Sequence, residues 1–193
     1  MWKLNAVAIV TILAATSPMS AEEHRELGPH EHGHGTLNIA VEGNTIKMEL
    51  EVPGDDIVGF EHDPVSTEEK AAFEKAKTTL AAPLALFKIP ETSKCSVTGA
   101  KVTIQEEHQE HEEEAKTKTD GNEPKEVKAH HNEFHVEYAL DCKAISDVTT
   151  MDFEYFKLFS NAQELDVNVV TPKGQSKFEA TRDKPSISLK GML

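Results

Sequence analysis

Two stretches of alternating apolar residues, 37–41 and 46–52, constrain the fold of this chain more than any other feature. Every second side chain in each stretch is apolar, which is typical of a strand that buries one face. Gly43-Asn44 lies between them and fits a two-residue hairpin turn. The predicted register pairs Val41 with Ile46, Ile39 with Met48 and Leu37 with Leu50, so one face of the hairpin is apolar throughout.

A single clear helix is predicted after this hairpin. Ser66 and Glu69 have the spacing of a capping box, and an apolar stripe that includes Phe73 continues to about Leu80. The helix is expected to pack this stripe onto the sheet. Short strands are predicted at residues 149–153, 165–171, 176–181 and 186–189, and the aromatic segment 153–159 is assigned to the core.

The two cysteines lie at the ends of two further predicted strands. Cys95 begins one that runs to Ile104, and Cys142 ends one that begins at Glu133. Antiparallel pairing with Cys95 opposite Cys142 places Ile104 opposite Glu133. An even number of isolated cysteines in an exported chain favours a disulfide, Cys95–Cys142, over zinc-thiolate ligation, which is the alternative.

Residues 105–132, between these strands, are rich in Glu, Lys and His and contain almost no apolar side chain. Such a segment cannot bury a core. We therefore predict an α+β fold, mostly antiparallel β with one clear helix and a long disordered His/Glu-rich loop, in one sheet or two. In the uniform hairpin register His108 faces position 129. The loop supplies weaker zinc-ligand candidates, His108, His111, His130 and His131, whereas His135 is expected to be a surface or packing residue.

The N-terminus has the features of a secretory signal peptide. Lys3 precedes an apolar run over residues 6–15, and small and polar residues continue to Ala21. A membrane span needs about 20 apolar residues, so we predict export with cleavage after Ala21; a retained N-terminal anchor is the alternative. The predicted organisation is a signal peptide at 1–21 and one domain at 22–193, with a mobile histidine segment at 22–35.

The charge of the chain indicates cation binding. Its formal net charge is −14, and it contains ten histidines. This balance argues against nucleic acid and anionic membrane surfaces as partners, because both attract Lys and Arg. The alternative is that the acidic residues only keep the protein soluble, but this would not explain the ten histidines.

The candidate metal ligands gather in two short motifs. In the first, alternate residues of an extended segment would point to one side, so His30, His32 and His34 could converge on one ion. In the second, Gly59-Phe60-Glu61-His62-Asp63-Pro64, an apolar anchor precedes His62 and the weaker candidate Glu61. Together they offer the nitrogen and oxygen donors that Zn²⁺ accepts.

His24 is a separate, weaker candidate. Cleavage after Ala21 would make it the third residue of the mature chain. A free amine, two backbone amides and a third-position imidazole form a square-planar site that favours Cu(II) or Ni(II). A periplasmic copper or nickel buffer or chaperone is therefore the main alternative to zinc binding.

These motifs together resemble the ZrgA-type zinc-binding periplasmic proteins. The likeness includes the signal peptide, the His30-Glu31-His32-Gly33 start, the hairpin, the motif around His62 and the His/Glu-rich loop between Cys-ended strands. It implies a periplasmic zinc-uptake accessory that captures Zn²⁺ and works with an ABC import system. His30, His32 and His62 match the family's motifs, whereas His34 and the loop histidines depend on composition.

A zinc-dependent hydrolase is the less favoured alternative. The sequence contains no HExxH, no GxSxG and no ordered Ser-His-Asp arrangement. A catalytic metal needs ligands that are fixed in position, and a glycine-containing tail and an acidic loop do not fix them. We expect a monomeric binding protein rather than an enzyme, with no membrane insertion after signal cleavage. A protein whose histidines are incidental would bind metal equally well without them.

Overall fold

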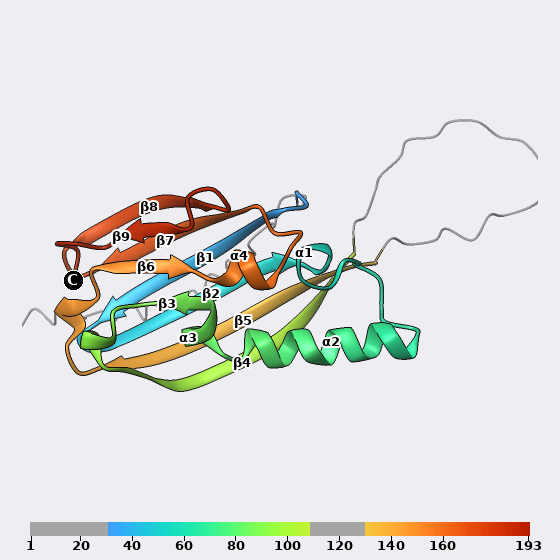
Figure 1. Ribbon diagram of the computed structural model, residues 1–193, viewed down its shortest axis with the longest axis horizontal. Helices are drawn as coiled ribbons and strands as arrows, with labels where there is room; N and C mark the ends of the chain where they lie inside the picture. Colours follow the sequence, from blue (N-terminus) through green and yellow to red (C-terminus); the bar gives the residue numbers. More distant parts are fainter. Residues whose placement is uncertain (1–30, 109–129) are drawn as a thin grey trace, which may run out of the picture.

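A computed structural model describes residues 31–108 and 130–193 (Figure 1). The predicted signal peptide, His24, His30, His111 and most of the acidic loop lie outside the described residues. For His108 and His130 the structure describes the backbone alone.

The fold is mostly β and largely antiparallel, as predicted. Among the described residues one helix has 14 residues and the other α-helices have five or fewer. The elements are β1 (His34–Glu42), β2 (Thr45–Pro53), α1 (Gly54–Val58), α2 (Thr67–Leu80), α3 (Pro83–Leu86), β3 (Phe87–Lys88), η1 (Glu91–Ser93), β4 (Cys95–His108), β5 (His130–Cys142), η2 (Ile145–Asp147), β6 (Thr150–Phe153), α4 (Tyr155–Leu158), β7 (Glu164–Thr171), β8 (Gly174–Thr181) and β9 (Ser186–Ser188).

The strands form two sheets. The sequence analysis had left open whether there would be one sheet or two. The larger sheet has six strands in the order β4-β5-β2-β1-β7-β8, and the smaller has three in the order β3-β6-β9. Strands β1 and β7 pair in parallel, and every other pair in the described sheets is antiparallel.

The predicted β1–β2 register is confirmed. The two strands turn at Gly43-Asn44, and Leu37 pairs with Leu50. The apolar residues of both strands are buried, because they share the face that packs on the core. The strand then ends in α1, a short helix that the sequence analysis did not predict.

The β4–β5 register departs from the prediction beyond its first residues. Cys95 faces Cys142 and a disulfide joins them. A β-bulge between Val97 and Gly99 then shifts the pairing by one residue, so Ile104 faces Phe134 rather than Glu133. For the same reason His108 faces His130 rather than position 129.

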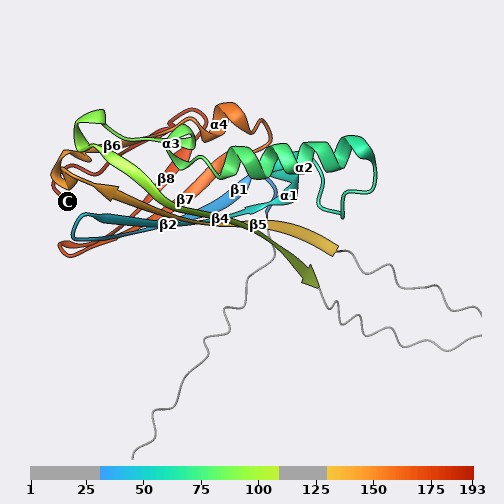
Figure 2. The same ribbon diagram turned by 90° about the horizontal axis from the view of Figure 1, so that it is seen from below.

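The core lies on one side of the six-stranded sheet, where α2, α3 and α4 are placed (Figure 2). Helix α2 begins with the predicted capping box and buries Phe73 and Leu80. The aromatic side chains of segment 153–159 are buried as predicted, whereas Leu158 is 51% exposed. No helix in the described part of the chain is long and apolar enough to cross a membrane.

Candidate metal site

The histidine segment forms a turn before β1. The His34 N–H donates to the Glu31 carbonyl oxygen (3.1 Å), and Gly33 has a φ of 88°. A positive φ at the third residue is what a type II turn requires. The prediction that His32 and His34 lie on one extended segment is therefore wrong, because glycine between them reverses the chain and β1 begins only at His34.

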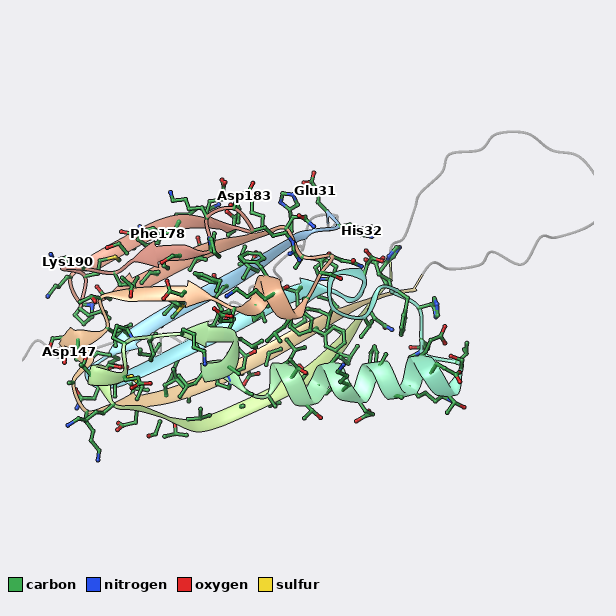
Figure 3. The ribbon with its side chains drawn as sticks, in the orientation of Figure 1. Glu31, His32, Asp147, Phe178, Asp183 and Lys190 are labelled. Atoms are coloured by element: carbon green, nitrogen blue, oxygen red, sulfur yellow. A yellow bond between two sulfur atoms is a disulfide. The ribbon has the colours of Figure 1, made fainter. Side chains whose placement is uncertain are left out.

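Gly33 is held in place by three backbone contacts. Its N–H donates to Asp56 Oδ1 of α1 (2.6 Å). Its carbonyl oxygen accepts from the N–H groups of Gln163 and Glu164 at 2.9 Å each. The turn that carries His32 is thus fixed to α1 and to the start of β7, and it lies near one end of the sheet (Figure 3).

Asp56 is an unusual carboxylate. It is 2% exposed, and Oδ2 has no hydrogen-bond partner among the described residues. Burial raises the pKa of Asp56 from its ordinary 3.8 to about 6, although the hydrogen bond from Gly33 acts in the opposite direction. The turn is therefore anchored to a buried group whose charge is unfavourable.

Two imidazoles converge on the carboxylate of Glu61. His32 Nε2 lies 2.9 Å from Glu61 Oε1, and His131 Nδ1 makes a short contact with Glu61 Oε2. The Glu61 side chain is 12% exposed, and its backbone oxygen accepts from the Asn132 N–H at 2.8 Å. The loop after α1, the histidine turn and β5 thus meet at one carboxylate.

The other two described histidines of the predicted principal set face different carboxylates. His34 Nδ1 lies 3.9 Å from Glu164 Oε1. His62 stacks on Phe60, with ring centroids 4.9 Å apart, and its Nε2 lies 3.8 Å from Glu69 Oε1 at the start of α2. The structure does not bring His32, His34 and His62 together around one point.

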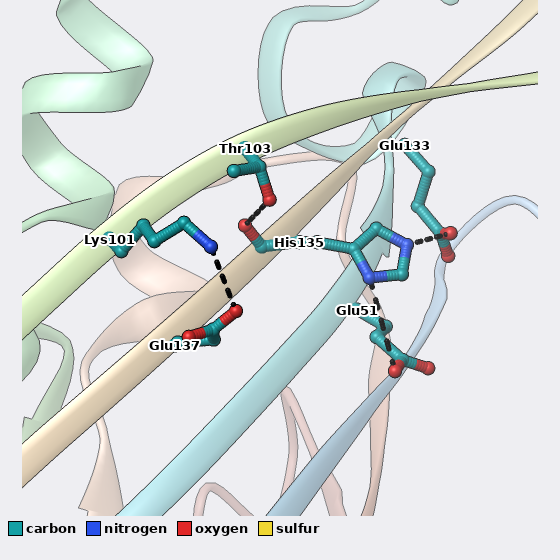
Figure 4. Close-up of polar contacts among 6 residues, drawn as sticks. All are labelled: Glu51, Lys101, Thr103, Glu133, His135 and Glu137. Carbon is teal, nitrogen blue, oxygen red and sulfur yellow. Dashed lines mark hydrogen bonds and ion pairs between the residues drawn. The ribbon is translucent and has the colours of Figure 1, made fainter.

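A second group of polar contacts lies on β5, where the sequence analysis assigned His135 to the surface or to packing. His135 Nε2 lies 2.5 Å from Glu133 Oε2, and Nδ1 lies 4.0 Å from Glu51 Oε1 on β2 (Figure 4). His131, Glu133 and His135 are alternate residues, so they share the face of β5 opposite to the buried Phe134 and Val136. That alternation is the sequence signal that could have identified them.

The donor set is nitrogen and oxygen, which suits zinc as a bound substrate. Each imidazole already faces a carboxylate, and the Cys95–Cys142 disulfide removes thiolate ligands from the described residues. Within residues 31–108 and 130–193, no three His, Cys, Asp or Glu side chains are already arranged around a metal position. An ion would therefore enter by separating an imidazole from its carboxylate.

Comparison with known proteins agrees with this chemistry. The model of the ZrgA family, described as zinc uptake proteins, matches residues 29–189, which include every described residue that contacts Glu61. A search of the curated proteins finds no significant match. The matched family is not an enzyme family. Because the match covers most of the chain, the protein belongs to the ZrgA family of zinc uptake proteins.

Proposed function

We propose that this protein captures Zn²⁺ in the periplasm and assists its import through an ABC transport system. Membership of a zinc uptake family supports the zinc-related role. The predicted signal peptide and the Cys95–Cys142 disulfide support an oxidising compartment outside the cytoplasm. The formal net charge of −14 favours attraction of a divalent cation.

The observation that carries the proposal is the convergence of His32 and His131 on Glu61. Zinc binds imidazole nitrogen and carboxylate oxygen at about 2.0–2.2 Å, so these three side chains offer a suitable ligand set. In the metal-free protein the imidazoles contact the carboxylate directly. In the zinc-bound protein the ion takes the place between them.

The remaining candidate ligands are assigned by proximity in sequence or space. We assign His30 to the same ion, because it is two residues from His32 and belongs to the same motif. His34 and His62, each beside a carboxylate, are proposed as outer ligands that receive the ion first. His24, His108, His111 and His130 are proposed as weaker collecting ligands.

Calorimetric titration of Zn²⁺ into the mature protein tests this assignment. The double variant His32→Ala/His131→Ala is expected to lose the tightest binding event. His62→Ala is the comparison variant, because it removes a proposed outer ligand, paired with Glu69, and should keep the tightest binding event. If the double variant binds zinc with the affinity and stoichiometry of the parent, the assigned site is wrong.

The role in uptake is tested in cells under zinc limitation. A strain that produces the double variant should grow as slowly as a strain without the protein, whereas the His62→Ala strain should retain most of its growth. Fractionation should recover the protein from the periplasm. Equal growth of the double variant and the parent would mean that uptake does not require zinc binding at Glu61.

Zinc affinity should fall as the pH decreases, because imidazole must be neutral to bind a metal. Titrations at pH 7.5 and 5.5 check this result. A site that kept its full affinity at the lower pH would not depend on histidine.

A further inference from the structure

A second imidazole on β5 lies between two carboxylates. His135 Nε2 faces Glu133 Oε2 at 2.5 Å, and Nδ1 faces Glu51 Oε1 at 4.0 Å. The side chains of His135 and Glu133 are 16% and 4% exposed. The described contacts of Glu61 come from other residues, His32, His131 and Asn132.

The two ring nitrogens have different surroundings. A histidine that binds a metal through one nitrogen commonly donates its other N–H to a carboxylate, which fixes the tautomer. Glu51 Oε1 lies 4.0 Å from Nδ1, beyond hydrogen-bond distance, and its negative charge favours the tautomer with the proton on Nδ1, which leaves Nε2 as the ligand nitrogen. Glu133, directly in front of Nε2, supplies a carboxylate oxygen at the same point (Figure 4).

The surroundings of the cluster favour a cation over an anion. His135 and Glu51 line an open depression of about 390 Å³ on the face of the sheet away from α2, together with Glu49 and Glu137. Lys101 lines the same depression, and its Nζ is paired with Glu137 Oε1 at 3.1 Å. Carboxylates therefore outnumber amines among the lining side chains, and the opening admits a hydrated ion.

We propose that Glu133 and His135 form a second zinc site, with Glu51 positioning the His135 ring. The ion displaces the proton shared by Nε2 and the carboxylate, that proton passes to water while Nδ1 keeps its own, and the N···O separation opens from 2.5 Å. Two ligands of one tetrahedral zinc ion lie roughly 3.3 Å apart, so a small rotation of Glu133 is enough. Water completes the coordination from the open depression.

The backbone around this site is well supported. The Thr103 hydroxyl donates to the His135 carbonyl oxygen at 3.1 Å, and Thr103 pairs with His135 in the β4–β5 ladder. Glu51 pairs with His135 from the other side, in β2. Both ligands thus stand on β5, which is paired on both sides, and the second site is independent of the turn that positions His32.

Nitrogen NMR of the imidazole rings tests the proposal directly. In the parent protein, two equivalents of Zn²⁺ should shift the Nε2 resonance of His135 strongly and leave its Nδ1 protonated. This measurement needs no substitution and therefore does not depend on the folding of a variant. An unchanged His135 spectrum at saturating zinc would overturn the proposal.

Calorimetry of variants supplies the second test. His135→Gln and Glu133→Gln should each lose one equivalent of bound zinc, and Glu51→Gln should weaken that equivalent by about 10-fold, as loss of an outer carboxylate does. Asp141→Asn is the matched control, because it removes an exposed carboxylate from the same face of β5 that does not line the depression. A lower melting temperature in His135→Gln with unchanged zinc stoichiometry would mean that the cluster only stabilises the fold, which would contradict the proposal.

The second site and the proposed capture site can be tested independently of each other, because different variants should remove each of them. His32→Ala/His131→Ala should retain the equivalent that depends on His135. Combining that pair with His135→Gln should remove both equivalents. Loss of both equivalents in the first variant alone would mean that β5 carries one shared site, which would also overturn the proposal.

Discussion

The two ends of the β4–β5 pair lie far apart (Figure 1), and different contacts hold each of them. At one end a disulfide joins Cys95 to the fully buried Cys142. At the other end His131 and His135 contact carboxylates. The same two strands therefore combine a covalently closed end with an end that contains metal donors.

This difference extends to the groups that surround each end. Buried polar atoms without a hydrogen-bond partner in the described part of the chain include Asp56 Oδ2 and Asn132 Oδ1, both at the histidine end. Buried polar groups of this kind lower stability. The comparison indicates that the disulfide end stabilises the fold, while the histidine end retains groups that suit ligand binding.

Removing the disulfide should produce the largest effect. Cys95→Ser/Cys142→Ser releases a cross-link between residues 47 apart in sequence. The chain-entropy model predicts a loss of about 4 kcal/mol in the free energy of unfolding. Urea denaturation measures this loss. Zinc titration under conditions where the variant stays folded should match the parent, and a folded variant that lost zinc binding would contradict the separation of the two ends.

At the histidine end, neutralising Asp56 should raise stability. Its folded pKa of about 6 exceeds the ordinary 3.8, so the folded state binds the proton more tightly than the unfolded state. The favourable contribution is complete below pH 3.8 and is lost as the pH rises through about 6. At pH 7 the ionised group therefore lowers the free energy of unfolding by up to about 3 kcal/mol relative to its protonated form.

Asp56→Asn keeps an oxygen acceptor for the Gly33 N–H and removes the buried charge. Urea denaturation at pH 5 and pH 7 should show a more stable variant at pH 7 and a smaller difference from the parent at pH 5. Asp55→Asn is the control, because it removes the same charge from a neighbour that is less buried. Parallel pH curves for parent and Asp56→Asn would show that Asp56 does not titrate as described.

The parts of the fold that were predictable are those where one face must be buried. The β1–β2 register follows from the alternation, because a slip by one residue would turn the apolar side chains of one of the two strands to the solvent face. The β4–β5 register was predicted correctly at Cys95 and wrongly at Ile104. A β-bulge inserts one extra residue into a strand and leaves little trace in the pattern of apolar and polar residues. The prediction assumed one constant register along both strands, and that assumption was wrong.

The site was less predictable than the fold. Composition identified the histidine-rich segments, and the resemblance identified the family. The contacts depend on tertiary structure: His131 meets Glu61 across 70 residues, and Gly33 turns His32 away from the line of β1. His135 was assigned to the surface or to packing because it alternates with Phe134 and Val136, whose side chains lie on the opposite face.

The smallest expected stability effect comes from replacing a turn glycine by alanine. It tests whether the turn at Gly33 positions His32 for zinc binding. Gly33→Ala and Gly43→Ala both place a side chain on a backbone of positive φ, 88° and 58° respectively, and each should cost about 1 kcal/mol in the free energy of unfolding. A Cβ at Gly33 would lie 3.1 Å from Gln163 Cγ, whereas no described atom lies within 4 Å of one at Gly43.

Only Gly33→Ala should weaken zinc binding, because it moves His32 relative to Glu61, while Gly43 lies in the hairpin turn at the far end of β1. Melting temperatures measure the shared stability cost, and zinc titration measures the difference. Equal zinc affinities in the two variants would mean that the turn does not position His32. The histidine end would then bind the ion through β5 and the Glu61 loop alone.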